Sequence, residues 1–135
     1  FLKRNAMATI GQLMNRDLSV VTEDMTVKQA AGQMHEQRIG SLLVKKGNDF
    51  SGIVTETDVV RAVAEHDDVA KTSVVQVMSS PILTVEKKLS PHYARDLMAN
   101  KRIRHLAVSD NGKIVGILSA RDLLAYFKTM SKEVP

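Results

Sequence analysis

The sequence predicts a mixed α+β fold made of two tandem β-α-β-β-α repeats that are packed sheet to sheet with pseudo-twofold symmetry. The chain aligns with itself after a shift of 64 residues. Each copy alternates short β-rich runs with amphipathic helical segments. One copy has only a small sheet and two helices, which cannot cover its own apolar sheet face. We therefore expect the two copies to cover each other.

The internal repeat rests on about a dozen identical positions, where chance would give roughly three or four. Most other positions keep their apolar or polar character. The identities include Met14 with Met78, Val21 with Val85, Ala30 with Ala94, Leu42 with Leu106, Gly52 with Gly116 and Asp58 with Asp122. The two copies are therefore expected to share one structure.

Capping residues locate the helix starts in both copies. Thr26 precedes Gln29 by three residues, and Ser90 is followed by Pro91, whose missing N–H costs nothing at a first helical position. An apolar stripe follows each cap, as expected for a helix packed on a sheet. Two further capping boxes predict short helical turns, Thr9 with Gln12 and Ser73 with Gln76.

Short β-rich runs predict three strands in each copy. The runs are 18–22, 41–44 and 51–54 in the first copy, and 82–85, 106–108 and 114–118 in the second. Polar turns join the last two strands of each copy, and Asn111-Gly112 is a strong hairpin signal. The last helices should start near Thr55 and Ser119.

The domain boundaries follow from the repeat. Residues 7–66 form the first repeat, the polar stretch 67–72 is a linker, and 73–130 form the second repeat. We leave residues 1–6 out of the fold, as a remnant of cloning or a cut point, because Met7 would serve as a natural start.

The composition is that of an ordinary globular protein. Of 135 residues, 44% are hydrophobic and 25% charged, which allows a packed core. There is no cysteine, which excludes disulfides and thiolate zinc sites and fits a cytoplasmic location. No apolar run approaches the roughly 20 residues of a membrane span, so we expect no membrane partner.

One motif recurs where the last strand of each copy should meet its last helix. Residues 52–58 read Gly-Ile-Val-Thr-Glu-Thr-Asp, and residues 116–122 read Gly-Ile-Leu-Ser-Ala-Arg-Asp. Free backbone N–H groups and the positive end of a helix suit a phosphate there. The hydroxyl can donate to the phosphate, and the carboxylate can accept from both hydroxyls of a ribose.

The same spacing also fits a capping box, in which the hydroxyl and the carboxylate only hold the helix start. The fixed glycine and the duplication favour the binding interpretation. The substitution Asp58→Ala separates the two readings. Loss of ligand binding at the first cleft would support the binding role, whereas a lower melting temperature with intact affinity would support the capping role.

A group of cations precedes the middle strand of the second copy. Ile103 should face the core, which turns Arg104 and His105 toward the mouth of the strand, where pseudo-twofold packing would bring them to a phosphate at the Thr55–Asp58 turn. Gly40 and Ser41 carry no charge at the matching positions, so the two clefts should differ in affinity for phosphates. A solvated strand edge is the alternative.

These features resemble a tandem pair of CBS domains, the Bateman module, over about residues 9–130. The resemblance is carried by the two motifs at 52–58 and 116–122, the apolar-Met pairs at 13–14 and 77–78, and Arg-Ile-Arg-His-Leu at 102–106. It implies that Asp58 and Asp122 bind ribose and that the hydroxyls of Thr55 and Ser119 bind phosphate.

The resemblance extends to the rest of the site. It places Arg104, His105 and Arg121 on phosphate, and Leu83 and Val20 on the adenine. The complete set of expected nucleotide-binding residues is Val20, Gly40, Thr55, Thr57, Asp58, Leu83, Arg104, His105, Ser119, Arg121 and Asp122. Thr57 stands where the family often has Arg, which puts a polyphosphate at the Asp122 cleft in doubt, and Leu43 and Ala107 replace a frequent Pro.

The implied function is regulatory. The resemblance predicts a homodimer that senses AMP, ADP or ATP between its repeats, with NAD and S-adenosylmethionine as further candidate ligands. A change of dimer packing would signal to an unknown effector protein. The alternatives are a structural dimerisation module with vestigial clefts and a nucleic-acid-binding protein.

Catalysis and nucleic-acid binding have weaker support in the sequence. The four histidines show no metal-ligand spacing, and no Ser-His-Asp arrangement is visible, so we expect neither an enzyme nor a catalytic cofactor. The net charge is +4 and the isoelectric point about 9.5. The basic residues are spread out, however, and aromatic residues for stacking bases make up only 4% of the chain.

Overall fold

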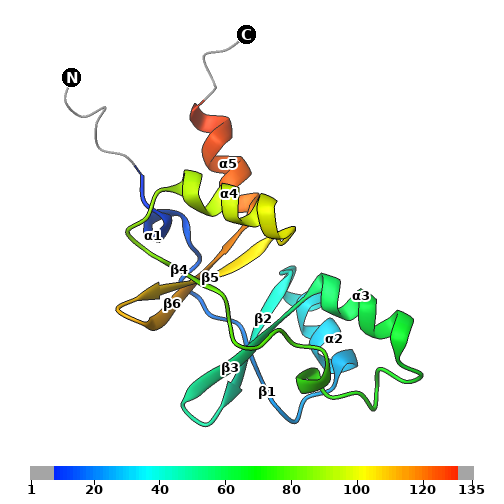
Figure 1. Cartoon of the computed structure of the whole chain (residues 1–135). Coiled ribbons are helices and arrows are strands. Elements are labelled where there is room, and N and C mark those ends of the chain that lie inside the picture. Colours follow the sequence, from blue (N-terminus) through cyan, green and yellow to red (C-terminus); the bar gives the residue numbers. More distant parts are fainter. Residues whose placement is uncertain (1–7, 131–135) are drawn as a thin grey trace, which may run out of the picture. The chain divides into compact units, whose positions relative to one another are not determined.

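The computed structural model describes residues 8–130, which form two compact units (Figure 1). Residues 18–82 make up one unit, called here the continuous unit. Residues 8–17 and 83–130 make up the other, called here the split unit because it combines two separate stretches of chain. The predicted start at Met7 and the segment 1–6 lie outside the described residues.

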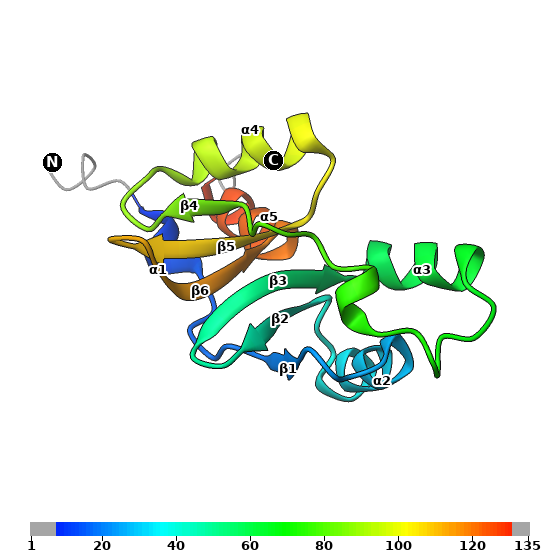
Figure 2. The ribbon, with the colours of Figure 1, turned by 60° about the horizontal axis from the view of Figure 1, so that its bottom comes forward.

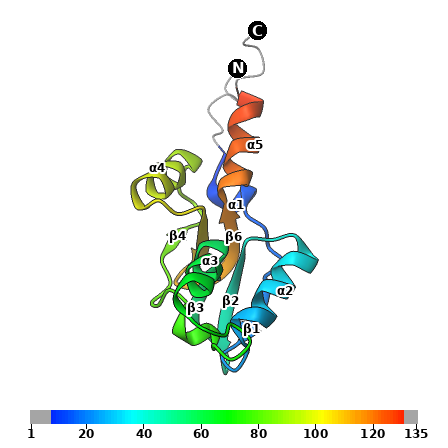
Figure 3. The same ribbon diagram turned by 90° about the vertical axis from the view of Figure 1, so that its right-hand side faces the viewer.

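The continuous unit contains a three-stranded sheet in the order β1-β2-β3 (Figure 2). β1 (Val20–Thr22) runs parallel to β2 (Ser41–Lys46), and β2 runs antiparallel to β3 (Asp49–Thr55). In Figure 3 helix α3 (Glu56–Glu65) overlaps the strands and helix α2 (Val27–Gln37) lies to their right. A short 3-10 turn, η2 (Val74–Gln76), completes the unit.

The split unit repeats this architecture. Its sheet has the order β4-β5-β6, made of β4 (Thr84–Glu86), β5 (His105–Asp110) and β6 (Lys113–Ser119). Its helices are α1 (Ile10–Leu13), α4 (Pro91–Lys101) and α5 (Ala120–Met130). The strand pairing has the same directions and even the same irregularity, after Val44 in β2 and after Val108 in β5. The predicted α+β fold with two β-α-β-β-α repeats is confirmed.

The helices begin where the capping residues predict. Thr26 accepts a hydrogen bond from the Gln29 amide at 3.1 Å, and the Gln29 side chain accepts from the Thr26 amide at 2.9 Å. Ser90 accepts from the His92 amide at 3.1 Å, and Pro91 is the first residue of α4. These bonds satisfy N–H groups that have no partner inside the helix.

The two hairpins have related but different turns. In β5-β6, Asn111 and Gly112 both have positive φ, at 51° and 83°, which is the requirement of a type I′ turn. In β2-β3, Gly47 has φ 63° and Asn48 does not have positive φ. The reversed order of Gly and Asn in the two copies accounts for this difference.

The opening segments of the two repeats are exchanged between the units. Asn15, from the first copy, pairs with Ile117 of β6, with N–H···O distances of 2.8 and 3.0 Å in the two directions. Ser79, from the second copy, pairs with Ile53 of β3 at 2.9 and 3.1 Å. The compact units therefore differ from the sequence repeats, because α1 packs with the second copy and η2 with the first.

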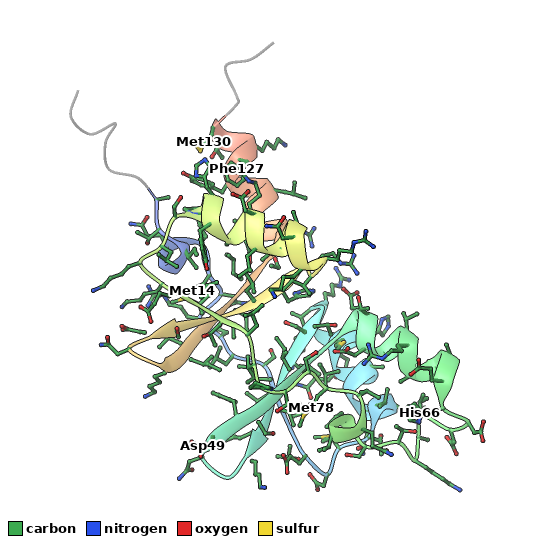
Figure 4. All side chains as sticks on the ribbon, viewed as in Figure 1. Met14, Asp49, His66, Met78, Phe127 and Met130 are labelled. Atoms are coloured by element: carbon green, nitrogen blue, oxygen red, sulfur yellow. The ribbon has the colours of Figure 1, made fainter. Side chains whose placement is uncertain are left out.

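The exchanged segments explain the glycine that opens each motif. A Cβ atom on Gly52 would lie 2.4 Å from Met78 Sδ and 2.9 Å from the Ser79 carbonyl oxygen. A Cβ on Gly116 would lie 2.4 Å from Met14 Sδ. Figure 4 marks both methionines. The fixed glycine, which the sequence interpretation took as support for ligand binding, is required by packing.

Each unit has an aliphatic core, as the composition predicts. In the split unit it includes Ile10, Leu106, Val108 and Leu118, and Ile103 packs against it, which confirms the predicted orientation of Ile103. In the continuous unit it includes Val21, Leu42, Val44, Val54 and Val74. The exchanged segments thus contribute Ile10 and Val74 to the cores that they cover.

Candidate functional site

The two motif copies form two strand-to-helix junctions. Junction 1 runs from Thr55 to Asp58, where β3 passes into α3, and junction 2 runs from Ser119 to Asp122, where β6 passes into α5. The middle strand fixes each junction in the same way. The Glu56 amide donates to the Gly40 carbonyl at 3.1 Å, and the Ala120 amide donates to the Arg104 carbonyl at 2.8 Å.

At junction 1 the Asp58 carboxylate is turned inward. Its side chain is only 7% exposed. Asp58 Oδ2 accepts from the Thr55 amide at 2.8 Å and from the Thr55 hydroxyl at 3.2 Å. The hydroxyl proton of Thr55 is therefore directed to a neighbouring carboxylate, and the pair serves as a capping box.

The other oxygen of Asp58 is bound by an arginine that the sequence interpretation did not select. Arg61 Nη2 lies 3.1 Å from Asp58 Oδ1 and donates to the Val77 carbonyl at 2.9 Å. Arg61 Nε also lies 3.9 Å from Glu65, at the weak limit of an ion pair. Asp58 is thus tied to the exchanged segment through Arg61.

At junction 2 the equivalent carboxylate is half-buried and has fewer partners. Asp122 Oδ2 accepts from the Ser119 amide at 2.8 Å, and the Ser119 hydroxyl oxygen accepts from the Asp122 amide at 3.1 Å. Within residues 8–130, Asp122 Oδ1 has no hydrogen-bond or ion-pair partner, and the Ser119 hydroxyl donates to no acceptor.

A count of acceptor positions separates the junctions. A carboxylate has about four lone-pair positions. Asp58 uses two of them for the bonds from Thr55, and its other oxygen, Oδ1, is paired with the Arg61 guanidinium at 3.1 Å. Asp122 uses one, for the Ser119 amide. The two acidic residues of the repeated motif therefore have different capacities for a ligand.

Cationic side chains accompany junction 2 within the split unit. Arg121 belongs to the junction itself, Arg104 immediately precedes β5, and both are exposed. The half-buried His105 pairs in the sheet with Ser119. The corresponding positions in the continuous unit are Thr57, Gly40 and Ser41, none of which is charged. The split unit thus has positive charge beside its junction that the continuous unit lacks, and the expected difference in affinity for phosphates stays a prediction.

The two apolar candidates differ in exposure. Leu83, just before β4, is 41% exposed, which leaves an apolar surface for a base to contact. Val20 begins β1 and is half-buried, and its carbonyl accepts from Gln33 Nε2 at 3.3 Å.

Arg61 could have been found from the sequence. It stands three residues after Asp58, so both side chains lie on one face of a helix. The matching residue in the second copy is Ala125, which cannot pair with Asp122. The repeat alignment therefore contained the signal, but attention to positions shared by both copies left it out.

Metal-ligand clusters and membrane-spanning helices are both absent from residues 8–130. These residues contain no cluster of three or more His, Asp or Glu side chains suited to a metal ion. None of the helices in this range is both long enough and apolar enough to cross a membrane.

Known proteins resemble the chain along nearly its whole length. A protein of Methanopyrus kandleri, MK0525, is 34% identical over 119 residues, which are 86% of this chain and 61% of that protein. The chain therefore spans less than two thirds of that relative. The solved structure of a CBS-domain protein from Burkholderia ambifaria MC40-6 has a TM-score of 0.85 and 33% identity, and covers 95% of this chain and 97% of that one.

A more distant structure shares the fold alone. The CBS domain pair of protein MJ0100, in complex with 5-methylthioadenosine and S-adenosyl-L-methionine, has a TM-score of 0.82 at 17% identity and covers 92% of this chain and 98% of that one. The sequence model of the CBS domain matches twice, at residues 10–65 and 74–129. The chain therefore belongs to the CBS domain family and carries two CBS domains in tandem.

Proposed function

We propose that this protein is a regulatory module that binds an adenine nucleotide through junction 2. The observation that carries the proposal is that this junction has polar groups available to bind a ligand. Asp122 keeps one carboxylate oxygen, and Ser119 keeps its hydroxyl proton, without a partner in the described residues. Both groups lie at the start of α5, an eleven-residue helix whose N-terminal N–H groups favour an anion.

The chemistry of the junction matches the parts of a nucleotide. The free oxygen of Asp122 can accept from ribose hydroxyls, while the Ser119 hydroxyl can donate to a phosphate. Arg104 and Arg121 supply positive charge for phosphate oxygens. Leu83, which is 41% exposed, offers an apolar surface for the base.

The MJ0100 structure supports the adenosine part of this ligand. Its two ligands, 5-methylthioadenosine and S-adenosyl-L-methionine, both contain an adenine nucleoside. By extension, the cations near junction 2 select AMP, ADP or ATP here, with NAD and S-adenosylmethionine as the competing ligands. Val20, Gly40, Thr55, Thr57, Asp58 and His105 stay predictions from the sequence.

Isothermal titration calorimetry of the full chain with AMP, ADP, ATP, NAD and S-adenosylmethionine tests the proposal. We expect one of the phosphate-bearing adenine ligands to bind, and Asp122→Asn to weaken it at least roughly tenfold, because the amide offers a donor where a ribose hydroxyl needs an acceptor. Asp96→Asn is the matched control, since Asp96 is an exposed carboxylate on α4 that pairs with Arg95. Equal affinity in both variants would contradict the proposal.

A structural dimerisation module is the second candidate, and a specific observation favours it. Val60 and Val63 on α3 are 69% and 62% exposed, and Leu124 on α5 is 71% exposed. Apolar side chains that gather on exposed helix faces are typical of protein interfaces. With the capping role of Asp58, they would suit a protein whose purpose is to pair.

The two functions are compatible, and we propose that a homodimer passes the ligand signal to an effector protein by a population shift. Sedimentation analysis of Val60→Lys and Leu124→Lys tests the dimer. A dimer that neither substitution weakens would exclude these helix faces. A dimer that forms but binds none of the five ligands would favour the purely structural role.

A further inference from the structure

The two copies of the motif helix have different residues at position 61 of the first copy and its match in the second, an arginine and an alanine. Arg61 on α3 bridges the Asp58 carboxylate and the Val77 carbonyl, at 3.1 and 2.9 Å. The matching position on α5 is Ala125, which is exposed. The carbonyl that matches Val77 belongs to Leu13, which precedes Met14 in the other exchanged segment. By the repeat alignment, the split unit thus has the matching carboxylate and carbonyl without the guanidinium.

The contact of Arg61 is stronger than its exposure indicates. An ion pair between two exposed side chains contributes little to stability. Here the carboxylate is 7% exposed, and a buried charge that loses its partner is costly. The same nitrogen, Arg61 Nη2, also donates to the Val77 carbonyl at 2.9 Å, so it is held between two acceptors. Arg61 therefore stays on Asp58 unless something replaces both contacts.

A bound ribose needs free carboxylate oxygens, and at junction 1 Arg61 is paired with one oxygen of Asp58. Its two neighbouring hydroxyls are donors and require two acceptor positions that reach the surface. At junction 1 the Asp58 side chain is nearly buried and its Oδ1 is paired with Arg61, whereas Asp122 is half-buried and its Oδ1 has no partner in the described residues. The Thr55 hydroxyl is likewise directed to Asp58, while the Ser119 hydroxyl keeps its proton.

We propose that Arg61 is a positioning residue that withdraws Asp58 from ligand binding, so that each chain binds one adenine nucleotide, at junction 2. This inference rests on the proposed function. In it, junction 1 is a structural cap that holds α3 and the exchanged segment together. A single substitution, from the small residue of the second copy to arginine in the first, separates a ligand site from a cap.

Exchange of the two residues tests the inference. The stoichiometry and affinity of AMP or ATP binding are measured by calorimetry for the full chain and for Arg61→Ala, Arg61→Lys and Ala125→Arg. We expect one ligand per chain in the natural protein and two in Arg61→Ala, because Asp58 then has free acceptor positions. Arg61→Lys should keep one, since an ammonium still pairs with Asp58. Ala125→Arg should weaken binding at least roughly tenfold.

Stoichiometry is the decisive measurement, because a merely structural role of Arg61 would change the melting temperature and leave the number of sites at one. Two ligands in the natural protein, or one in a folded Arg61→Ala, would overturn the inference and leave the proposed function standing. No binding in any of the chains would overturn both. If Arg61→Ala does not fold, Ala125→Arg decides alone, since it changes an exposed residue and natural affinity in that variant would overturn the inference.

Discussion

The two junctions have the same backbone arrangement but differ in which polar atoms have no partner. Both end an antiparallel strand, start a helix, and place a hydroxyl three residues before a carboxylate. At junction 1 the acidic side chain is nearly buried and bound by Arg61, whereas at junction 2 it is half-buried with one oxygen open. Duplication thus preserved the packing positions, and changes at a few polar positions separated the chemistry.

Matched core truncations should have the largest effect, and they test whether the two halves are equally dependent on packing. Leu42 and Leu106 occupy matching positions and are each 1% exposed. We expect Leu42→Ala and Leu106→Ala to cost about 2–5 kcal/mol each, through lost burial and the cavity left behind. Urea unfolding followed by circular dichroism measures both. A cost below about 1 kcal/mol in one of them would show that its half is less tightly packed.

Substitution of the motif glycines should have the next largest effect. Gly52→Ala and Gly116→Ala would force a Cβ against methionine atoms, and we expect a loss of about 1–3 kcal/mol. The loss should be larger at Gly52, where a backbone carbonyl oxygen lies 2.9 Å from the new Cβ, against 3.1 Å at Gly116. Thermal unfolding checks this order.

Gly32→Ala is the control for the glycine pair. Gly32 lies in α2 with open space around its Cβ position, so alanine should stabilise the helix by about 0.5–1 kcal/mol. Stabilisation by alanine at Gly52 or Gly116 as well would contradict the role given to the exchanged methionines.

Removal of the motif carboxylates separates the two junctions most directly. Asp58→Ala should cost about 1–3 kcal/mol, because it leaves a capping amide without its acceptor and Arg61 without its partner. Asp122→Ala should cost about 1 kcal/mol, the usual value for a helix cap. Paired melting curves provide the measurement, and an equal loss at both junctions would remove the distinction drawn between them.

A pH-dependent contribution of one surface pair should have the smallest effect. The hydrogen bond from Lys87, 2.9 Å away, lowers the pKa of Asp110. Burial acts against it, and the nearby charges of Lys87 and Lys88 lower the pKa further. A carboxyl whose pKa is lowered by folding contributes stability above its unfolded pKa, near 4, and loses it as the pH falls through the folded value.

Lys87→Met should therefore melt slightly below the natural protein at pH 6, and the difference should vanish near pH 2. The matching residues in the first copy are Glu23 and Lys46, which form no ion pair in the described residues. Lys46→Met should accordingly show no pH-dependent difference. A difference for Lys87→Met that persists at pH 2 would point to packing in place of charge.

The apolar and turn positions made most of the fold predictable. Thr26, Ser90 and Pro91 start helices where the sequence places them, and Asn111-Gly112 forms the expected turn. The exchange of the opening segments was not predicted, because the repeat alignment is identical whether Met14 packs on its own copy or on the other. Only a distant contact, such as that between Asn15 and Ile117, distinguishes the two arrangements.

The sequence predicted which positions form the candidate site, but not how buried each side chain is or which partners it binds. The sequence pointed to Asp58 and Asp122 equally, and the capping interpretation was already open for both. Burial and donor count decide between the roles, and these depend on a neighbour, Arg61, that is not part of the shared motif. Positions at which the two copies differ were therefore more informative about chemistry than those at which they agree.

The split unit has a consequence for the order in which the chain matures. During synthesis the continuous unit emerges as one stretch and is complete once residue 82 has been made. The residues around Asn15 must wait for Ile117, roughly 100 residues later, which at about 5–20 residues per second is a delay of roughly 5–20 s. The residues around Asn15 thus leave the ribosome before the continuous unit and reach their native partner after it, and a nascent chain can have one unit complete while the other is still unfolded.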